Sequence, residues 1–94
     1  MRLAISQARK VNVISGSQIR AARALLGLTQ NDLVERSGVS FATIQRMETI
    51  GTGRSSVANL DAVQKALEKA GVQFIPENGG GAGVRMTKPG GDDA

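Results

Sequence analysis

Residues 26–48, LGLTQNDLVERSGVSFATIQRME, decide the fold. Two short helical patterns meet in this stretch at Gly38-Val39-Ser40. Gly38 lies where the first helix must end in a left-handed backbone conformation, which a β-carbon opposes. Ser40 can then cap the second helix. A helix, a short turn with glycine and a second helix are the sequence form of a helix-turn-helix, although purely architectural helix pairs look similar.

The second helix, predicted over residues 40–48, has an unusual outer face. A helical rotation of about 100° per residue separates its two sides. The inner side holds Ser40, Ile44 and Met47. The outer side and its flank hold Phe41, Ala42, Gln45 and Arg46. A short amphipathic helix normally shows Lys and Glu to solvent, so this uncharged face with one arginine requires an explanation.

The residues on both sides of the stretch continue the helical pattern. QIRAARALL follows Ser17, and a helix is predicted from there to Gly27. Thr29 is the expected N-cap of the next helix, with Asp32 as its capping-box partner. VANLDAVQKALEKA follows Ser56, and its helix is predicted to end at Gly71. The chain is therefore expected to be mainly α.

The character of the chain changes after residue 71. VQFIP alternates as a strand does, ENGGGAG is rich in turn residues, and VRMT fits a returning strand. We expect a basic arm over 1–16, a helical domain over 17–71, a short β-hairpin or strand over 72–87 and a disordered tail over 88–94. The hairpin is a candidate dimerisation element, because an isolated two-stranded hairpin is marginal in water and its apolar face exceeds what a small helical core can cover.

Composition excludes several classes of protein. The 94 residues contain no Cys and no His, so the commonest metal ligands and the commonest general base are missing. We therefore expect no enzyme, no metal and no cofactor. No apolar run approaches a membrane span, and a reducing, cytoplasmic location is expected. Net charge is +4 and is carried at the front: residues 1–23 have five bases and no acid, whereas the rest has seven bases and eight acids. A basic front end fits a polyanionic partner, or is simply a solvated arm.

The stretch resembles the lambda-repressor/Cro type of helix-turn-helix domain, also called the xenobiotic-response-element type, found in small bacterial transcriptional regulators. The residues that carry the resemblance are Leu26-Gly27-Leu28-Thr29-Gln30, Leu33, Gly38-Val39-Ser40, Ile44 and Glu48. It covers residues 17–71 and implies a compact four- to five-helix bundle. The loop departs from the family, because Thr49-Ile50-Gly51 stands where Asn-Gly is frequent.

The resemblance also implies site residues. Helix 40–48 would lie in the major groove, where base pairs are distinguished by their donors and acceptors. The expected base contacts are Phe41, Ala42 and Arg46, with Gln45 beside them. The expected phosphate contacts are Gln30, Thr43 and Arg54, and on charge alone Arg20, Arg9 and Lys10. Arg23 and Glu48 would form an ion pair that ties the first helix to the recognition helix.

The function that follows is a sequence-specific regulator of transcription, a repressor that binds double-stranded DNA. Since one helix reads few base pairs, a homodimer on an inverted-repeat operator is expected. The alternatives are an antitoxin of a toxin–antitoxin pair, with a toxin as protein partner, and a protein-interaction module that keeps the fold without DNA binding. An adaptor would tolerate acids on the recognition helix, and residues 41–47 contain none.

Overall fold

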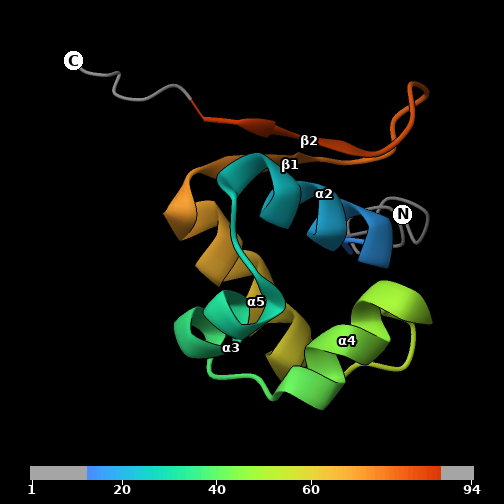
Figure 1. Ribbon diagram of the computed structural model, residues 1–94. Helices are drawn as coiled ribbons and strands as arrows, with labels where there is room; N and C mark the ends of the chain where they lie inside the picture. Colours follow the sequence, from blue (N-terminus) through green and yellow to red (C-terminus); the bar gives the residue numbers. More distant parts are fainter. Residues whose placement is uncertain (1–12, 88–94) are drawn as a thin grey trace.

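The computed structural model describes residues 13–87 as four helices with a two-stranded antiparallel hairpin at one end (Figure 1). The helices are α2 (Gly16–Leu26), α3 (Gln30–Ser37), α4 (Phe41–Thr49) and α5 (Val57–Ala70). The strands are β1 (Val72–Ile75) and β2 (Gly83–Met86). The predicted mainly α fold with a C-terminal hairpin is confirmed. The predictions for Arg9 and Lys10 and for a disordered tail lie outside the described residues.

Each of these helices begins at a Ser or Thr whose side chain accepts a backbone hydrogen bond in the first turn. The N-caps are Ser15, Thr29, Ser40 and Ser56. The first of them corrects the sequence prediction, which started this helix after Ser17. Ser15 and Gln18 form a capping box, in which the Gln18 backbone N–H donates to the Ser15 hydroxyl at 3.1 Å and the Ser15 N–H donates to the side-chain Oε1 of Gln18 at 2.9 Å. Such a reciprocal pair outweighs the single hydroxyl of Ser17.

The core forms where the helices meet. Its buried apolar residues are Ile14, Ile19, Ala22, Leu33, Val39, Ile44, Met47, Val63, Ala66, Leu67 and Val72. Ile14 is 1% exposed, so the packed domain begins before residue 17, the start that the sequence predicted for it. At Gly16 a β-carbon would collide with the carbonyl oxygen of Met47. Glycine therefore lets the start of α2 lie directly against the end of α4.

The loop between α4 and α5, where the sequence departs from the family it resembles, is attached to the N-terminal segment. The Thr52 hydroxyl donates to the carbonyl oxygen of Ile14 at 2.8 Å. Gly51 has a φ of 127°, which side chains disfavour. A turn follows, closed by a hydrogen bond from the Ser55 N–H to the Thr52 carbonyl at 3.0 Å.

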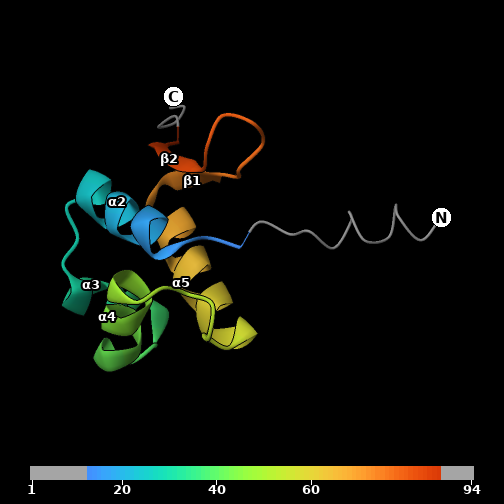
Figure 2. The same ribbon diagram turned by 90° about the vertical axis from the view of Figure 1, so that its right-hand side faces the viewer.

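The hairpin lies over α2, at the end of the molecule opposite α3 and α4 (Figures 1 and 2). Its register pairs Val72 with Met86 and Phe74 with Val84. The helices cover this apolar face in part: Val72 is buried, and Phe74 and Val84 are half-buried against the core. Met86 remains 49% exposed. The strands fold back on the helices of their own chain, with α2 as well as α5 beneath them.

None of α2–α5 is long and apolar enough to cross a membrane. Within residues 13–87 no group of three or more acidic side chains lies close enough together to hold a metal ion. The surface that remains to be explained is the one presented by α3 and α4.

Candidate nucleic-acid interface

The turn between α3 and α4 fixes how α4 is presented. Gly38 has a φ of 77°, the left-handed conformation that the sequence predicted, and its N–H donates to the Val34 carbonyl at 2.8 Å. Val39 is buried and anchors the turn in the core. Ser40 accepts from the Thr43 N–H at 3.2 Å and starts α4. Because each step is held by a local contact, α4 has a defined direction relative to α3.

The outer face of α4 is exposed and contains no acid. Phe41, Ala42, Gln45 and Arg46 are all exposed, as the sequence pattern predicted. Phe41 is 42% exposed, so part of this residue is available to a partner. Thr43 is half-buried, and its hydroxyl oxygen accepts from the Ser40 hydroxyl at 2.9 Å. This face offers uncharged groups and one guanidinium to a partner.

Two arginines border a hollow at the end of α4. Its lining residues are Arg46, Ile50, Gly51, Gly53 and Arg54. Gly51 and Gly53 contribute only backbone to its lining, and both guanidinium groups belong to exposed residues. Arg46 from the helix and Arg54 from the following loop are thereby brought to one surface. In double-stranded DNA the backbone phosphates lie beside the base edges of each groove, so two neighbouring arginines can contact one of each.

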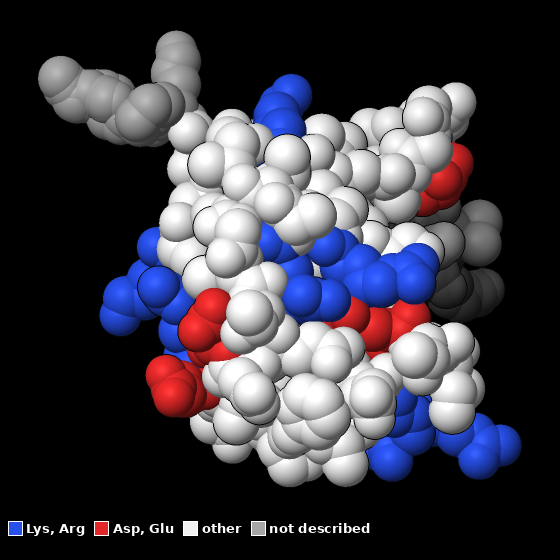
Figure 3. Space-filling view, in the orientation of Figure 1, with Lys and Arg blue, Asp and Glu red and all other residues white. Residues whose placement is uncertain are grey.

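The remaining basic candidate, Arg20, comes from α2 and is exposed. It lies four residues after Gly16, which touches α4, and three before Arg23, which bonds to α4. By helical geometry Arg20 is thus on the flank of α2 that faces α4. Figure 3 shows Lys and Arg gathered in a band across the middle of this face, with acidic side chains along its lower side.

Arg23 and Glu48 form a bidentate ion pair. Arg23 Nε donates to Glu48 Oε2 and Arg23 Nη2 donates to Glu48 Oε1, each at 2.7 Å. The Glu48 side chain is 1% exposed and that of Arg23 is 19% exposed. The hydrogen bond to Glu48 raises the pKa of Arg23 further, against the lowering effect of burial. The pair joins α2 to α4 and withdraws the only acid of α4 from the surface.

Gln30 is the first residue of α3, where free backbone amides favour an anion. Its side chain is not simply free for that purpose. The Gln30 Nε2 donates to Glu48 Oε1 at 3.1 Å, a contact that the sequence prediction missed because it joins residues of two helices.

A second glutamine, Gln18, was also missed as a buried contact. It is 6% exposed, and its Nε2 donates to the carbonyl oxygens of Ile75 at 3.2 Å and Gly83 at 2.9 Å. The Ser-x-x-Gln spacing from Ser15 was the signal that could have found its capping role. Nothing in the local sequence signals its contact with the hairpin.

Comparisons with known proteins agree with this geometry. The helix-turn-helix family matches residues 19–72. The chain is 34% identical over 81 residues to an uncharacterised HTH-type transcriptional regulator of Sinorhizobium medicae (strain WSM419) and to another of Rhizobium meliloti (strain 1021). The match covers 83% of this chain and 58% of each relative, so the chain spans little more than half the length of those relatives.

Proposed function

We propose that this chain, which belongs to the helix-turn-helix family of DNA-binding transcription regulators, is a sequence-specific repressor that places α4 in the major groove of double-stranded DNA. The observation that carries the proposal is the outer face of α4, where Phe41, Ala42, Gln45 and Arg46 are exposed while Glu48 is buried against Arg23. An acid on that face would repel phosphate, and its removal into the core leaves a surface suited to base edges.

The expected roles divide between bases and backbone. Arg46 can donate two hydrogen bonds to a guanine, and Phe41 can contact a thymine methyl group. Arg54 and Arg20 add positive charge beside α4, and charge of this kind positions a protein on the duplex without reading its sequence. Gln30 and Thr43 are uncharged candidates for phosphate contacts. Occupation of an operator by this surface would then block transcription.

The test is selection from random duplex DNA with the purified chain. An enriched inverted repeat is the expected result, and transcription from a promoter that carries it should fall when the chain is added. Arg46→Ala protein is the matched control, because it should lose the enriched motif while keeping weak, salt-sensitive binding. Failure to enrich any sequence, with binding equal on all duplexes, would show that α4 does not read DNA.

The proposal includes a homodimer joined through the hairpin, residues 72–87. Since most of the apolar face is covered, the outer edge of β2 is the part left for a second copy. The Thr87 N–H donates to the Gly71 carbonyl at 2.9 Å, so by alternation the backbone groups of Val84 and Met86 point away from β1. Within residues 13–87 those groups have no hydrogen-bond partner.

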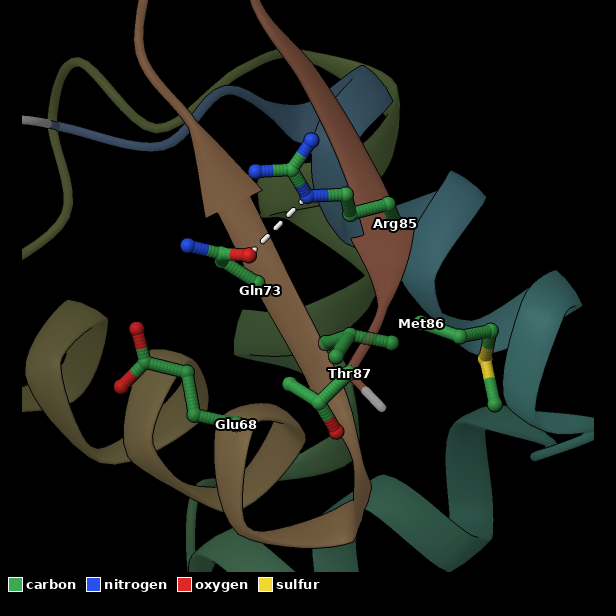
Figure 4. Close-up of a pocket in the computed structure, with 6 residues that line it drawn as sticks. Glu68, Gln73, Arg85, Met86 and Thr87 are labelled. Atoms are coloured by element: carbon green, nitrogen blue, oxygen red, sulfur yellow. Dashed lines mark hydrogen bonds between the residues drawn. The ribbon is translucent and has the colours of Figure 1, made fainter. Parts of the chain in front are cut away.

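Side chains next to this edge favour the same interface. Leu25 is 47% exposed and lies seven residues after Gln18, hence on the side of α2 that faces the hairpin. Met86 on β2 is 49% exposed. Figure 4 shows Arg85 extended over β1 to Gln73, to whose Oε1 its Nε donates at 3.0 Å, while Met86 points the other way. The guanidinium is thereby held away from the edge, where two copies of it would repel each other.

A pair of proline substitutions tests the edge. Met86→Pro removes an N–H that points outward, so the hairpin should persist while the protein sediments as a monomer. Arg85→Pro is the control, because its N–H points toward β1 and its loss should disrupt the hairpin itself. Met86→Pro protein that sediments as the same dimer as wild type would exclude the β2 edge as the interface.

A further inference from the structure

If Gln30 only bound a DNA phosphate, its hydrogen bond to Glu48 would have no role in that contact. The ion pair of Glu48 with Arg23 is complete without it, and a surface glutamine needs no buried partner. We infer that Glu48 is a positioning residue for DNA binding: it holds the Gln30 amide in one orientation, with one N–H directed at a backbone phosphate beside α3. This inference rests on the proposed function.

The carboxylate is a fixed acceptor. Both Glu48 oxygens accept from Arg23 at 2.7 Å, and the side chain is 1% exposed. Arg23 is held in turn, because its Nη1 donates to the Leu28 carbonyl at 3.0 Å. Glu48 therefore cannot rotate to follow Gln30, and the glutamine must adapt to it.

The chemistry of the amide then sets its orientation. A carboxylate only accepts hydrogen bonds, so the NH2 group of Gln30, and not its carbonyl oxygen, must face Glu48. One N–H of that group donates to Glu48 Oε1 at an N···O distance of 3.1 Å. The other N–H has no hydrogen-bond partner within residues 13–87, and the planar amide fixes its direction. It lies at the first residue of α3, beside backbone N–H groups that also favour an anion.

The three side chains thus connect three helices, from Arg23 on α2 through Glu48 on α4 to Gln30 on α3. Without Glu48, the Gln30 side chain would have to be ordered when DNA binds. Ordering one flexible side chain lowers affinity roughly two- to tenfold. The loss should be equal on specific and random duplexes, because a phosphate contact carries no sequence information.

A double-mutant cycle measures this coupling through DNA affinity at one salt concentration. The variants are Gln30→Ala, Glu48→Gln and the double mutant, each compared on the selected duplex. Glu48→Gln should weaken binding in the presence of Gln30 by roughly two- to tenfold more than it does in the Gln30→Ala background. The charge change at residue 48 is the same in both backgrounds and cancels. Equal factors in the two backgrounds would overturn the positioning role.

A second variant leaves the ion pair intact, so it tests the inference even if Glu48→Gln unfolds the protein. Gln30→Asn shortens the amide by one methylene, and it cannot reach Glu48 and a phosphate together. We expect it to bind as weakly as Gln30→Ala, with the salt dependence of wild type because the lost contact is neutral. Wild-type affinity for Gln30→Asn would overturn the inference.

The side-chain amide gives a readout that needs no DNA. In wild-type protein the Gln30 NH2 signals should show restricted motion in NMR relaxation, whereas those of exposed Gln45 on α4 serve as the unrestrained reference. Equal mobility of the two would contradict the anchoring. If wild-type protein binds no duplex at all, the proposed function fails; binding with an additive cycle overturns the positioning role alone.

Discussion

The two ends of the molecule are built by different means. At the α3–α4 end, each element is set by its neighbours in sequence: Thr29 caps α3, Gly38 ends it and Ser40 caps α4. At the hairpin end, the strands are placed by residues far away in the chain. Gln18 reaches Ile75 and Gly83 across 57 and 65 positions. Local signals therefore describe the first end well and the second poorly.

The comparison also separates the two kinds of surface. The α3–α4 end exposes the outer side chains of α4, whereas the hairpin covers α2 and α5. A substitution on the exposed face of α4 should change binding with little effect on stability. A substitution at a contact between residues far apart in the sequence, such as that of Gln18 with the hairpin, should lower stability with little direct effect on binding. The Arg23–Glu48 pair belongs to both categories, since it supports the fold beneath the binding face.

The largest effect is expected from breaking that pair. Arg23→Ala leaves the Glu48 carboxylate, 1% exposed, without its partner and should reduce the free energy of unfolding by about 3–5 kcal/mol. Replacing both residues with leucine should cost less than either single change, because no lone charge is buried. Urea unfolding of Arg23→Leu, Glu48→Leu and the double leucine variant measures the coupling.

The exposed pair Lys65–Asp61 is the matched control. Its side chains are 72% and 55% exposed, at a separation of 3.2 Å. Lys65→Ala should change stability by only about 0.5 kcal/mol or less. A coupling near zero for Arg23 and Glu48, like that expected for the exposed pair, would mean that the bidentate geometry contributes nothing to stability.

The next effect concerns the hairpin end. Gln18→Ala removes the two hydrogen bonds to the strands and the one from the Ser15 N–H to Gln18 Oε1, and should cost about 1–3 kcal/mol. Hydrogen exchange should report the loss first at the backbone amides of β1 and β2. Gln64→Ala is the control, because the side-chain hydrogen bond of Gln64 within residues 13–87 is made to Glu68 at an exposed site. Uniform loss of protection across all four helices would show that the hairpin has no separate stability.

The third effect concerns DNA binding. Loss of a base contact should weaken binding by an energy similar to that of the hairpin contact, and should leave the free energy of unfolding almost unchanged. Arg46→Ala should weaken binding to the selected site by ~1–3 kcal/mol and relax preference at one base position. Arg54→Ala, from the other side of the same hollow, should weaken all duplexes alike and reduce the slope of log affinity against log salt by about one. If Arg46→Ala lowers the affinity for the selected site and for random DNA by the same factor, the assignment of Arg46 to a base contact is wrong.

Features set by residues close together in the sequence were predicted well, and features set by distant residues were not. Caps and glycines predicted the bounds of α3, α4 and α5 within about one residue, because such signals act over one helical turn. The exposed face of α4 followed from the helical period. The start of α2 was misplaced because two serines, Ser15 and Ser17, competed and only the contact with Gln18 decides between them.

Contacts between elements were outside the reach of local patterns. The Arg23–Glu48 pair was expected only through a family resemblance, since their spacing of 25 positions carries no periodic signal. The burial of Phe74 and Val84 depends on where α2 lies beneath the strands, which alternation alone does not specify. The contacts of Gln18 with the hairpin and of Gln30 with Glu48 were missed for the same reason. A polar residue in a helical pattern is predicted to lie at the surface, and the pattern does not identify its hydrogen-bond partner.

The smallest effect distinguishes the two capping boxes, one at each end of the comparison. In α3 the Thr29 N–H donates to Asp32 Oδ2 at 2.9 Å and the Asp32 N–H donates to the Thr29 hydroxyl at 3.0 Å, whereas α2 uses neutral Gln18. The hydrogen bond from the Thr29 backbone lowers the pKa of Asp32. A depressed folded pKa stabilises the protein above the unfolded value of about 4, and this contribution is lost as pH falls through the folded pKa.

Asp32→Asn should therefore be slightly less stable than wild type near neutral pH, with a difference that vanishes as pH falls below about 4. The effect is small because Asp32 is solvated. Thermal unfolding from about pH 7 down to about pH 2 measures it, with Gln18→Glu as the converse change. That variant should give α2 the same acid-sensitive cap and destabilise the contact with the hairpin. A difference between Asp32→Asn and wild type that stays constant over the whole range would mean that the side-chain shape, and not its charge, closes the α3 capping box.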